Sequence, residues 1–313
     1  MLDLSIVIVN YNTWDLLQDC LTSLFNSQIN FSFKVVVVDN ASSDTSAAMI
    51  KAQFPQVDLI ASEMNGGFAY ANNLGLRHVG FGDDGLTEPH APRYALILNP
   101  DTILPPTALV EMIKFMDSCP EVGVVGPKLV RTDGSLDLAC RRAFPTPTVS
   151  FYRMVGLSKL FPRSRGFGRY NMTFADPDQL LEVDSVVGAF MMVRREAIAQ
   201  TGLLDETYFM YGEDLDWAYR IKAKDWKIYY NPAVTVTHVK RASSRRSRRA
   251  QIEFYRAMDI FYRKFYAAET PFWLHGLVIV GITLRWRLTQ LKYYLLDFVK
   301  PDTNVKDNIS AKV

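Results

Sequence analysis

The stretch KVVVVDNASSD, residues 34–44, runs from four consecutive valines into an acid and an amide. Consecutive β-branched side chains are typical of a strand buried on both faces, because a half-exposed strand alternates apolar and polar residues. The Asn-Ala-Ser-Ser-Asp that follows has the chemistry of a turn and a helix start. This stretch therefore predicts a buried strand that ends at Asp39 and leads into a helix. Asp39 either caps that helix or accepts hydrogen bonds from a ribose or a base.

Similar apolar runs recur on both sides of this strand. They lie at residues 4–9, 57–61, 94–99 and 122–126. Amphipathic segments separate them, around residues 14–26, 43–53, 67–78 and 107–118. Near-continuous apolar strands alternating with helices predict an α/β fold, with a mostly parallel central sheet covered by helices on both faces. Ligands of such sheets bind at the carboxyl ends of the strands.

The composition is that of an ordinary globular protein. The 313 residues are 49% hydrophobic and 22% charged, and a formal net charge of +2 indicates no nucleic-acid partner. Cys20, Cys119 and Cys140 are widely spaced without a CxxC pair, which favours reduced thiols in a cytosolic protein over disulfides or a thiolate metal site. The N-terminus lacks a basic region and a cleavage site, so we expect a first strand and not a signal peptide.

The pattern is less regular after Gly126. Residues 151–182 are poorly patterned and are interpreted as a mobile loop or a small helical excursion. Regular structure returns at 183–202, a strand running into a short helix, and at 212–226, a helix. Residues 227–239 are interpreted as two short strands.

Clusters of polar residues interrupt the apolar pattern at four places, of which Asp39 is the first. The second is NGGFAYANNLG, residues 65–75. Two glycines before a helix let the backbone approach a ligand closely, and a helix N-terminus favours phosphate. Asn72 lies inside a helical pattern despite its poor propensity, which indicates work for its side chain. The alternative is an Asn-Gly turn with polar surface residues.

The third cluster, Asn99-Pro100-Asp101, follows a strand. A strand-end carboxylate suits a Mg²⁺ or Mn²⁺ ion that keeps waters and binds through substrate phosphates, whereas ordinary turn chemistry is the alternative. The fourth cluster follows Gly212 in FMYGEDLDWAYR. Its acids are Glu213, Asp214 and Asp216. Acids there also complement the dipole of a helix, so the cluster alone does not decide between structure and catalysis.

Five of these motifs occur in the order and approximate spacing seen in glycosyltransferase family two. They are SIVIVNYN, VVVVDNASSD, NGGFAYANNLG, LILNPDT and FMYGEDLDWAYR. Over residues 3–245 the chain resembles this family, and most of all its bacterial rhamnosyltransferase-type members. The resemblance implies an inverting enzyme of the GT-A fold that uses a nucleotide-sugar donor and a divalent metal, Mg²⁺ or Mn²⁺.

The resemblance also implies a division of the chain. Residues 1–245 would form the GT-A domain, with a nucleotide-sugar-binding half over 1–126 and an acceptor-binding half over 127–245. Residues 246–313 would form a C-terminal helical extension.

Roles for individual residues follow from the same resemblance. The nucleotide-sugar would be bound by Asn10, Asp39, Asn65, Gly66, Gly67, Asn72 and Asn99. Asp101 would hold the metal, and His238 would help to bind metal or pyrophosphate. Asp214 would be the base that deprotonates the acceptor, and Glu213 would hold the acceptor or the local loop. Relatives commonly have a glycine three residues after the histidine, where this chain has Arg241, so the phosphate-side loop departs from the pattern.

The expected function is transfer of L-rhamnose from dTDP-rhamnose to a hydroxyl of a saccharide or lipid-linked saccharide acceptor in cell-surface polysaccharide synthesis. UDP-hexoses or a galactofuranose donor are the alternatives within the fold. A nucleotidyltransferase would want a glycine-rich, basic first loop, which VNYNTWDLL lacks. The Glu213-Asp214 pair argues against a non-catalytic nucleotide-sugar-binding module.

The C-terminal residues 246–268 and 270–299 are interpreted as helices rich in aromatics and arginine. Their 13-residue apolar run, 272–284, is too short to cross a bilayer, which takes about 20 residues. Arginines and aromatics beside such a run suit a helix lying in an anionic membrane interface, whereas the alternative is a solvated basic face over an ordinary core helix. We therefore expect a cytoplasmic protein, peripheral on the inner face of the cell membrane.

Overall fold

The computed structural model describes residues 2–83, 85–240 and 248–299. The chain divides into two compact units, Met1–Arg241 and Ala242–Val313. The domain boundary predicted after residue 245 lies outside the described residues.

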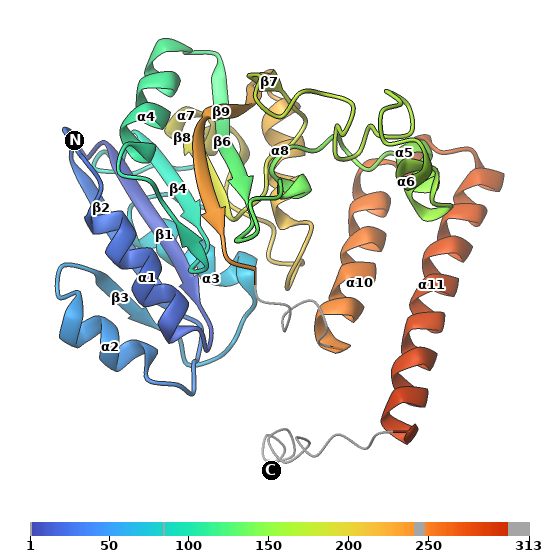
Figure 1. Ribbon diagram of the computed structural model, residues 1–313, viewed down its shortest axis with the longest axis horizontal. Coiled ribbons are helices and arrows are strands. Elements are labelled where there is room, and N and C mark those ends of the chain that lie inside the picture. The colour runs from blue at the N-terminus through green and yellow to red at the C-terminus, as the bar shows by residue number, and fades with distance from the viewer. Residues whose placement is uncertain (1, 84, 241–247, 300–313) are drawn as a thin grey trace. The chain divides into compact units, whose positions relative to one another are not determined.

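The first four long strands of the first unit form a parallel sheet (Figure 1). In spatial order they are β3 (Asp58–Ala61), β2 (Phe33–Asp39), β1 (Leu4–Asn10) and β4 (Tyr94–Leu98). All seven residues of β1 and all five of β4 are buried, as expected for strands with helices on both faces. The α/β class predicted from the apolar runs is confirmed.

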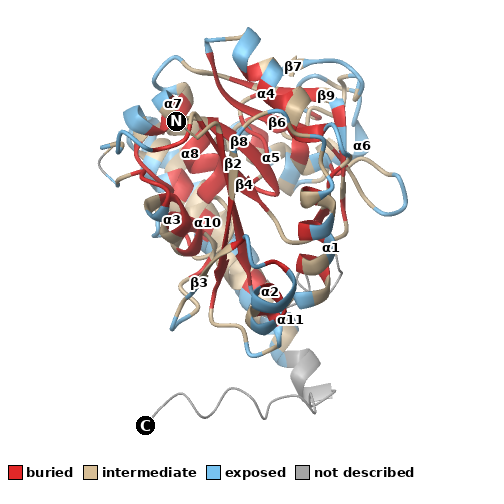
Figure 2. Cartoon of the chain, turned by 90° about the vertical axis from the view of Figure 1, so that its left-hand side faces the viewer, coloured by how far each residue is buried: buried red, intermediate tan, exposed pale blue. Residues whose placement is uncertain are grey.

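Three helices cover the two faces of these strands. They are α1 (Trp14–Phe25), α2 (Ser46–Gln53) and α3 (Phe68–His78). Crossovers between parallel strands are right-handed, so the direction of each step across the sheet decides the face on which its helix lies. The chain steps outward from β1 to β3 through α1 and α2 and then returns past β1 to β4 through α3. Accordingly α1 and α2 lie on one face and α3 on the other (Figures 1 and 2).

The second half of the unit extends the same sheet beyond β4. Its strands are β5 (Thr102–Ile103), β6 (Val122–Val130), β7 (Leu181–Glu182), β8 (Phe190–Arg194) and β9 (Lys227–His238). Strand β8 lies antiparallel between β4 and β6, whereas β9 runs parallel to β6. The short strands β5 and β7 pair antiparallel with β9 and complete a nine-stranded sheet in the described residues.

Helices of the second half follow or separate these strands. They are α4 (Ala108–Ser118), η1 (Leu138–Cys140), α5 (Pro147–Met154), α6 (Leu157–Leu160), α7 (Arg195–Thr201) and α8 (Glu213–Lys222). The segment 151–182 thus contains the end of α5 and all of α6, in agreement with a small helical excursion.

The prediction of two short strands in 227–239 is wrong. One strand, β9, spans this segment, although Pro232 has no N–H to donate to a neighbour. The register with β6 shifts here, because Pro127 pairs with Asn231 and Lys128 pairs with Thr235. The irregularity accommodates the proline without ending the strand.

The strand order places the ligand edge of the sheet. Along the chain, strands are added on one side of β1 as far as β3, and β4 is then added on the other side of β1. Such a reversal separates the loops that follow the two neighbouring strands and opens a crevice at their carboxyl ends. Asn10 ends β1, and Asn99 follows β4 directly. The polar clusters found in the sequence lie around this edge.

The second unit contains two long helices, α10 (Arg248–Phe265) and α11 (Phe272–Val299), joined through η2 (Ala267–Glu269). Side chains link the two helices: the Thr289 hydroxyl donates to Tyr255 Oη at 3.3 Å, and Tyr262 Oη lies 3.0 Å from His275 Nδ1. The two helices predicted over 246–268 and 270–299 are confirmed within residues 248–299, and residues 246 and 247 lie outside the described residues. Within the described part of the chain, no helix is long and apolar enough to cross a membrane.

Candidate active site

The ends of β1 and β2 are joined by their polar side chains. Parallel register places Asn10 beside Asp39, and Asn10 Nδ2 donates to Asp39 Oδ1 at 2.9 Å. Asp39 Oδ2 accepts the backbone N–H of Ser42 at 3.1 Å, so this carboxylate also holds the turn that follows β2. Both residues are almost fully buried. Each Asp39 oxygen keeps a second lone pair that a ligand hydroxyl or base N–H can use.

The glycine loop is fixed by an asparagine that the sequence analysis missed. Asn40 accepts the N–H of Gly66 at 3.2 Å and donates to Asn65 Oδ1 at 2.9 Å and to the carbonyl of Gly67 at 3.2 Å. Gly67 has φ +93°, and a Cβ there would lie 2.3 Å from the carbonyl oxygen of Phe209. Only glycine therefore lets this loop approach the segment before α8 so closely.

The two neighbouring asparagines of α3 have different surroundings. Asn73 clamps the backbone of Leu204, accepting its N–H at 3.1 Å and donating to its carbonyl at 2.8 Å. Asn72 donates to the carbonyl of Phe68, and its Oδ1 is buried with no hydrogen-bond partner. Asn99 Oδ1 is likewise buried and unpartnered. Buried acceptors without partners are rare, so both amides suit contacts with a bound hydroxyl.

Asp101 and His238 are brought together by the pairing of β5 with β9. Thr102 pairs with His238, and the N–H of Val239 donates to the carbonyl of Asp101 at 2.8 Å. This places His238 Nε2 3.2 Å from Asp101 Oδ1. Two residues far apart in the sequence therefore lie in contact.

Asp137 completes this group, and the sequence analysis did not single it out. Its Oδ2 lies 2.9 Å from His238 Nδ1 and also accepts from Lys240 Nζ. Although burial acts to raise it, the hydrogen bonds from His238 and Lys240 hold the pKa of Asp137 well below its usual range. Although burial acts in the opposite direction, the bonds to Asp101 and Asp137 raise the pKa of His238.

The residues present fit a divalent cation only as a shared site. Among the described residues no group of three or more His, Cys, Asp and Glu side chains could hold a metal ion. Asp101 and His238 supply one carboxylate and one imidazole at the same point. A Mg²⁺ or Mn²⁺ ion held by one or two protein ligands takes its other ligands from water and substrate phosphates.

The acids of α8 follow a strained turn. Tyr211 has φ +70° and Gly212 has φ +86°, so two consecutive residues adopt left-handed backbone immediately before Glu213. Such strain in a non-glycine residue costs about 1–3 kcal/mol and is retained mostly at functional sites. The turn directs Glu213 and Asp214 into the protein, where both are 5% exposed.

Asp214 is held by a buried arginine. Its Oδ2 accepts from Arg142 at 2.7 Å and from the N–H of Gly188 at 3.0 Å. Although burial opposes it, the charge of Asp214 raises the pKa of Arg142, which therefore stays charged. Arg142, which the sequence analysis missed, thus compensates the buried charge of Asp214.

Glu213 has the opposite surroundings. Its Oε2 is buried without a hydrogen-bond partner among the described residues. Burial, and after it the negative charge of Asp214, raises the pKa of Glu213 to about 8. One acid of the pair is paired with a cation, and the other holds its proton near neutral pH.

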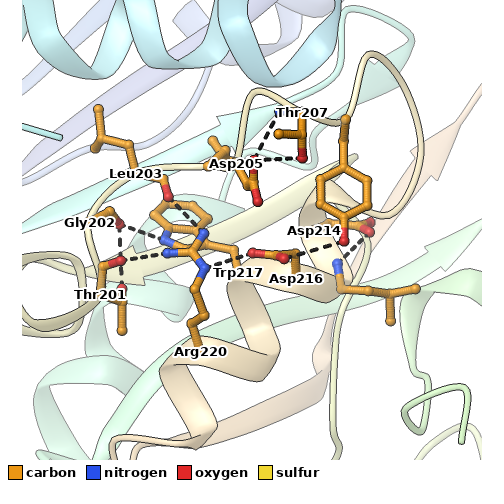
Figure 3. A network of polar contacts seen from close by, with 12 residues as sticks. Thr201, Gly202, Leu203, Asp205, Thr207, Asp214, Asp216, Trp217 and Arg220 are labelled. Atoms are coloured by element: carbon orange, nitrogen blue, oxygen red, sulfur yellow. Dashed lines mark hydrogen bonds and ion pairs between the residues drawn. The ribbon is translucent and has the colours of Figure 1, made fainter. Parts of the chain in front are cut away.

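Asp216 anchors α8 (Figure 3). Its Oδ1 accepts from Arg220 Nε at 2.7 Å, and Arg220 also donates to the carbonyls of Thr201 and Leu203. Trp217 Nε1 donates to the carbonyl of Gly202 at 2.9 Å. This network fixes the helix that carries Glu213 and Asp214.

A separate cavity of about 400 Å³ opens beside the helical excursion. Its lining includes the charged residues Arg165, Arg169, Glu182, Asp184 and Lys222. Lys222 is already paired with Glu182 and Asp184. The cavity is therefore lined by both cations and acids, with one aromatic ring, Phe174.

The fold and the polar edge of its sheet define a nucleotide-sugar transferase of the GT-A type. The sequence matches the family described as "Glycosyltransferase like family 2" over residues 3–253, and the chain belongs to this family.

Three curated relatives illustrate that membership. An N-acetylglucosaminyl-diphospho-decaprenol L-rhamnosyltransferase of Mycobacterium tuberculosis is 28% identical over 245 residues, 78% of each chain. Rhamnosyltransferase WbbL of Escherichia coli is 28% identical over 241 residues, covering 74% of this chain and 82% of WbbL. The low-salt glycan biosynthesis hexosyltransferase Agl10 of Haloferax volcanii is 27% identical over 236 residues, covering 75% of this chain and 67% of Agl10.

Solved structures share the fold at lower identity. TarS of S. aureus (residues 1–349) has a TM-score of 0.53 at 14% identity, with 83% of this chain and 64% of that chain covered. GalNAc-T7 with UDP, GalNAc and Mn²⁺ has a TM-score of 0.57 at 16% identity, with 83% and 48% covered. This chain therefore spans less than two thirds of either solved chain, and the likeness concerns the fold.

Proposed function

We propose that this glycosyltransferase moves L-rhamnose from dTDP-rhamnose to a hydroxyl of a saccharide or lipid-linked saccharide acceptor, with inversion at the anomeric carbon, in cell-surface polysaccharide synthesis. The observation that carries the choice of sugar is that two relatives named as rhamnosyltransferases match about three quarters of this chain. UDP-hexoses and a galactofuranose donor remain the alternatives within the same fold.

Asn10 and Asp39 bind the nucleoside in this proposal, because they lie side by side at the edge of β1 and β2. The loop Asn65-Gly66-Gly67 brings backbone close to the donor. Asn72 and Asn99 use their unpartnered Oδ1 atoms as acceptors for sugar or ribose hydroxyls. A divalent cation bound at Asp101 and His238 would supply positive charge to the leaving diphosphate.

The proton of the attacking hydroxyl goes to Asp214 in this proposal. Asp214 accepts hydrogen bonds from Arg142 and from the N–H of Gly188, and it keeps lone pairs for the incoming proton. Glu213 donates a hydrogen bond to the acceptor, since its raised pKa of about 8 keeps the side chain protonated at neutral pH. In-line displacement needs no enzyme nucleophile.

A donor panel tests this function. The purified protein is incubated with Mn²⁺ and dTDP-rhamnose, UDP-glucose or UDP-galactofuranose, with and without a saccharide acceptor, and released nucleoside diphosphate is measured. We expect release with dTDP-rhamnose that increases when acceptor is present. Release with a UDP-sugar alone would replace rhamnose by that sugar. Binding without release would favour a non-catalytic module. In a parallel incubation with a nucleoside triphosphate and a sugar 1-phosphate, release of pyrophosphate would favour a nucleotidyltransferase.

We also propose that the second unit attaches peripherally to the anionic inner leaflet of the cell membrane. Helix α11 exposes an apolar stripe formed by Trp273, Leu277, Val280, Leu284, Leu288 and Leu291. Between residues 272 and 294 the sequence has no acid but has Arg285, Arg287 and Lys292. An apolar stripe flanked by cations suits an anionic interface.

A second copy of the chain fits this stripe less well. Leu284 lies near the middle of the stripe, so a two-fold antiparallel pair would bring Arg285 and Arg287 of one copy near those of the other. No acid on the stripe compensates that repulsion. Charge therefore favours a lipid surface as the occupant.

A further inference from the structure

His238 lies between two carboxylates that contact different ring nitrogens. Asp137 Oδ2 is 2.9 Å from Nδ1, and Asp101 Oδ1 is 3.2 Å from Nε2. The imidazole is 3% exposed and the Asp137 side chain 2%, whereas the Asp101 side chain is 21% exposed. Only the Asp101 side of this arrangement is open to a ligand.

The two carboxylates differ in their distance from the imidazole ring and in their burial. Asp137 accepts from His238 over the shorter distance, in the more buried position. A neutral imidazole has one N–H, and a hydrogen bond at one nitrogen decides which nitrogen keeps the lone pair. With the proton on Nδ1, Nε2 offers its lone pair on the side of Asp101.

We propose that Asp137 is a positioning residue, which fixes the Nδ1–H tautomer of His238 and so aims the Nε2 lone pair at the cation site shared with Asp101. This inference rests on the proposed function, in which that site binds a divalent metal. Carboxylates that orient a metal-bound histidine in this way raise metal affinity, and their loss typically lowers it about 10–100-fold.

Asp137 caps the short helix η1 with the oxygen that does not contact His238. Asp137 Oδ1 accepts the N–H of Ala139 at 3.3 Å and so caps η1, whereas Oδ2 takes His238 and Lys240. Lys240 also donates to Oδ2, so Asp137→Asn is made in the Lys240→Met background, where the amide oxygen can keep the cap while Nδ2–H faces His238. Because two donors cannot share one hydrogen bond, the ring must then accept at Nδ1 and carry its proton on Nε2. The substitution therefore inverts the tautomer while it keeps the cap.

The tautomer can be measured without metal. The chain has four histidines, His78, His90, His238 and His275, so imidazole ¹⁵N spectra of the full-length protein are simple, and a His238→Gln variant assigns the resonances. At a pH where the ring is neutral, we expect Nδ1–H in the wild type and Nε2–H in Asp137→Asn. An Nε2–H tautomer in the wild type, or no change in the variant, would overturn the proposal.

Metal binding is the second readout. Calorimetric titration with Mn²⁺ alone should show an affinity about 10–100-fold weaker in Asp137→Asn than in the wild type. Asp133→Asn is the matched control, since Asp133 lies exposed in the same loop and bonds only to Ser135 there, and it should leave the affinity unchanged. Lys240→Met alone should keep the Nδ1–H tautomer. That result would show that Asp137 sets the tautomer of His238 without its ion pair to Lys240.

The two readouts separate this inference from the proposed function. If the wild type binds no Mn²⁺ although Asp137→Asn inverts the tautomer, the metal role of the site fails and the orienting role of Asp137 stands. If Mn²⁺ binds equally to both proteins and the tautomer is unchanged, Asp137 only caps η1 and the proposal is wrong.

Discussion

At the residue scale, the acids that begin α8 have opposite environments despite being neighbours in the sequence. Asp214 is paired with Arg142, and Glu213 is buried without a partner for Oε2. Asp214→Asn removes the proposed base, so we expect kcat to fall by about 10²–10⁴ with donor binding unchanged. Glu213→Gln should raise the acceptor KM more than it lowers kcat. Steady-state kinetics with varied acceptor separate the two effects.

The opposite outcome would exchange these roles. A group with a raised pKa and a free lone pair is itself suited to take a proton near neutral pH. If Asp214→Asn turned over near the wild-type rate while Glu213→Gln was inactive, Glu213 would be the base and Asp214 its positioning partner. Thermal unfolding of both variants controls for a loss of folded protein.

The same glutamate predicts a pH dependence of stability. Its pKa rises from 4.5 to about 8 on folding, so the folded state keeps a proton that the unfolded chain loses between these values. This group therefore lowers the free energy of unfolding as pH rises through that window, and above it adds no further change. Glu213→Gln removes the effect. Relative to wild type, its Tm should rise progressively from pH 5 to about pH 8, and a constant difference would contradict the assignment.

Residue-scale features divide into those that local sequence predicted and those that it could not. Asp101 and Asp214 lie in motifs that the sequence predicted as site residues, and the family resemblance added His238. Asn40 and Asp137 were not, because nothing within a few residues of either reveals its partner. Asp137 contacts His238 because β9 pairs with β6, the strand that precedes Asp137. The sequence has no local signal for that contact.

At the scale of elements, the apolar runs predicted β1, β2, β3 and β4 and the start of β6, but not the two-residue strand β5. The runs of β1 and β4 are continuous because both faces of these strands are buried. The insertion of β8 between β4 and β6 was not predictable in the same way, since it depends on long-range pairing after the excursion at 151–182. The prediction of two short strands in 227–239 was wrong because the register shift beside Pro232 accommodates the proline within one strand, β9.

Helix α11 carries the element-scale prediction. Leu284→Glu together with Leu288→Glu places two negative charges in the centre of its exposed stripe, where an anionic interface would repel them. We expect the wild type to sediment with vesicles that contain phosphatidylglycerol but not with neutral phosphatidylcholine vesicles. The double variant should remain in the supernatant.

A matched control lowers the net charge by the same two units on the other helix. Arg256→Gln with Arg263→Gln changes exposed positions of α10 and should weaken sedimentation less if the stripe of α11 makes the contact. Self-association of the wild type in analytical ultracentrifugation, with no vesicle binding, would instead assign the stripe to a second copy.

At the scale of the whole first unit, the two halves share one sheet and one set of clamps. Strand β4 of the first half pairs with β8 of the second along five residues. Phe68 N–H donates to the carbonyl of Phe209 at 2.7 Å, and Asn73 bonds to both backbone groups of Leu204. The glycine loop with α3 and the turn before α8 are thereby held in one body, as the proposed reaction between two substrates requires.

This connection predicts the effect of breaking a clamp that touches no substrate. Asn73→Ala leaves the N–H and carbonyl of Leu204 without their buried partner, which costs about 1–3 kcal/mol of stability. Because both halves contribute to one sheet, the residues of 2–240 should still unfold in one transition at a lower Tm, seen at the same temperature by far-UV and near-UV circular dichroism. The exposed Asn26→Ala is a control of the same chemical type, since Asn26 lies at the end of α1 with an ordinary φ of −84°. Two separated transitions in Asn73→Ala would show that the halves fold independently. In steady-state kinetics, a lower kcat with an unchanged KM for the donor would show that this clamp positions the acids of α8 relative to the bound sugar.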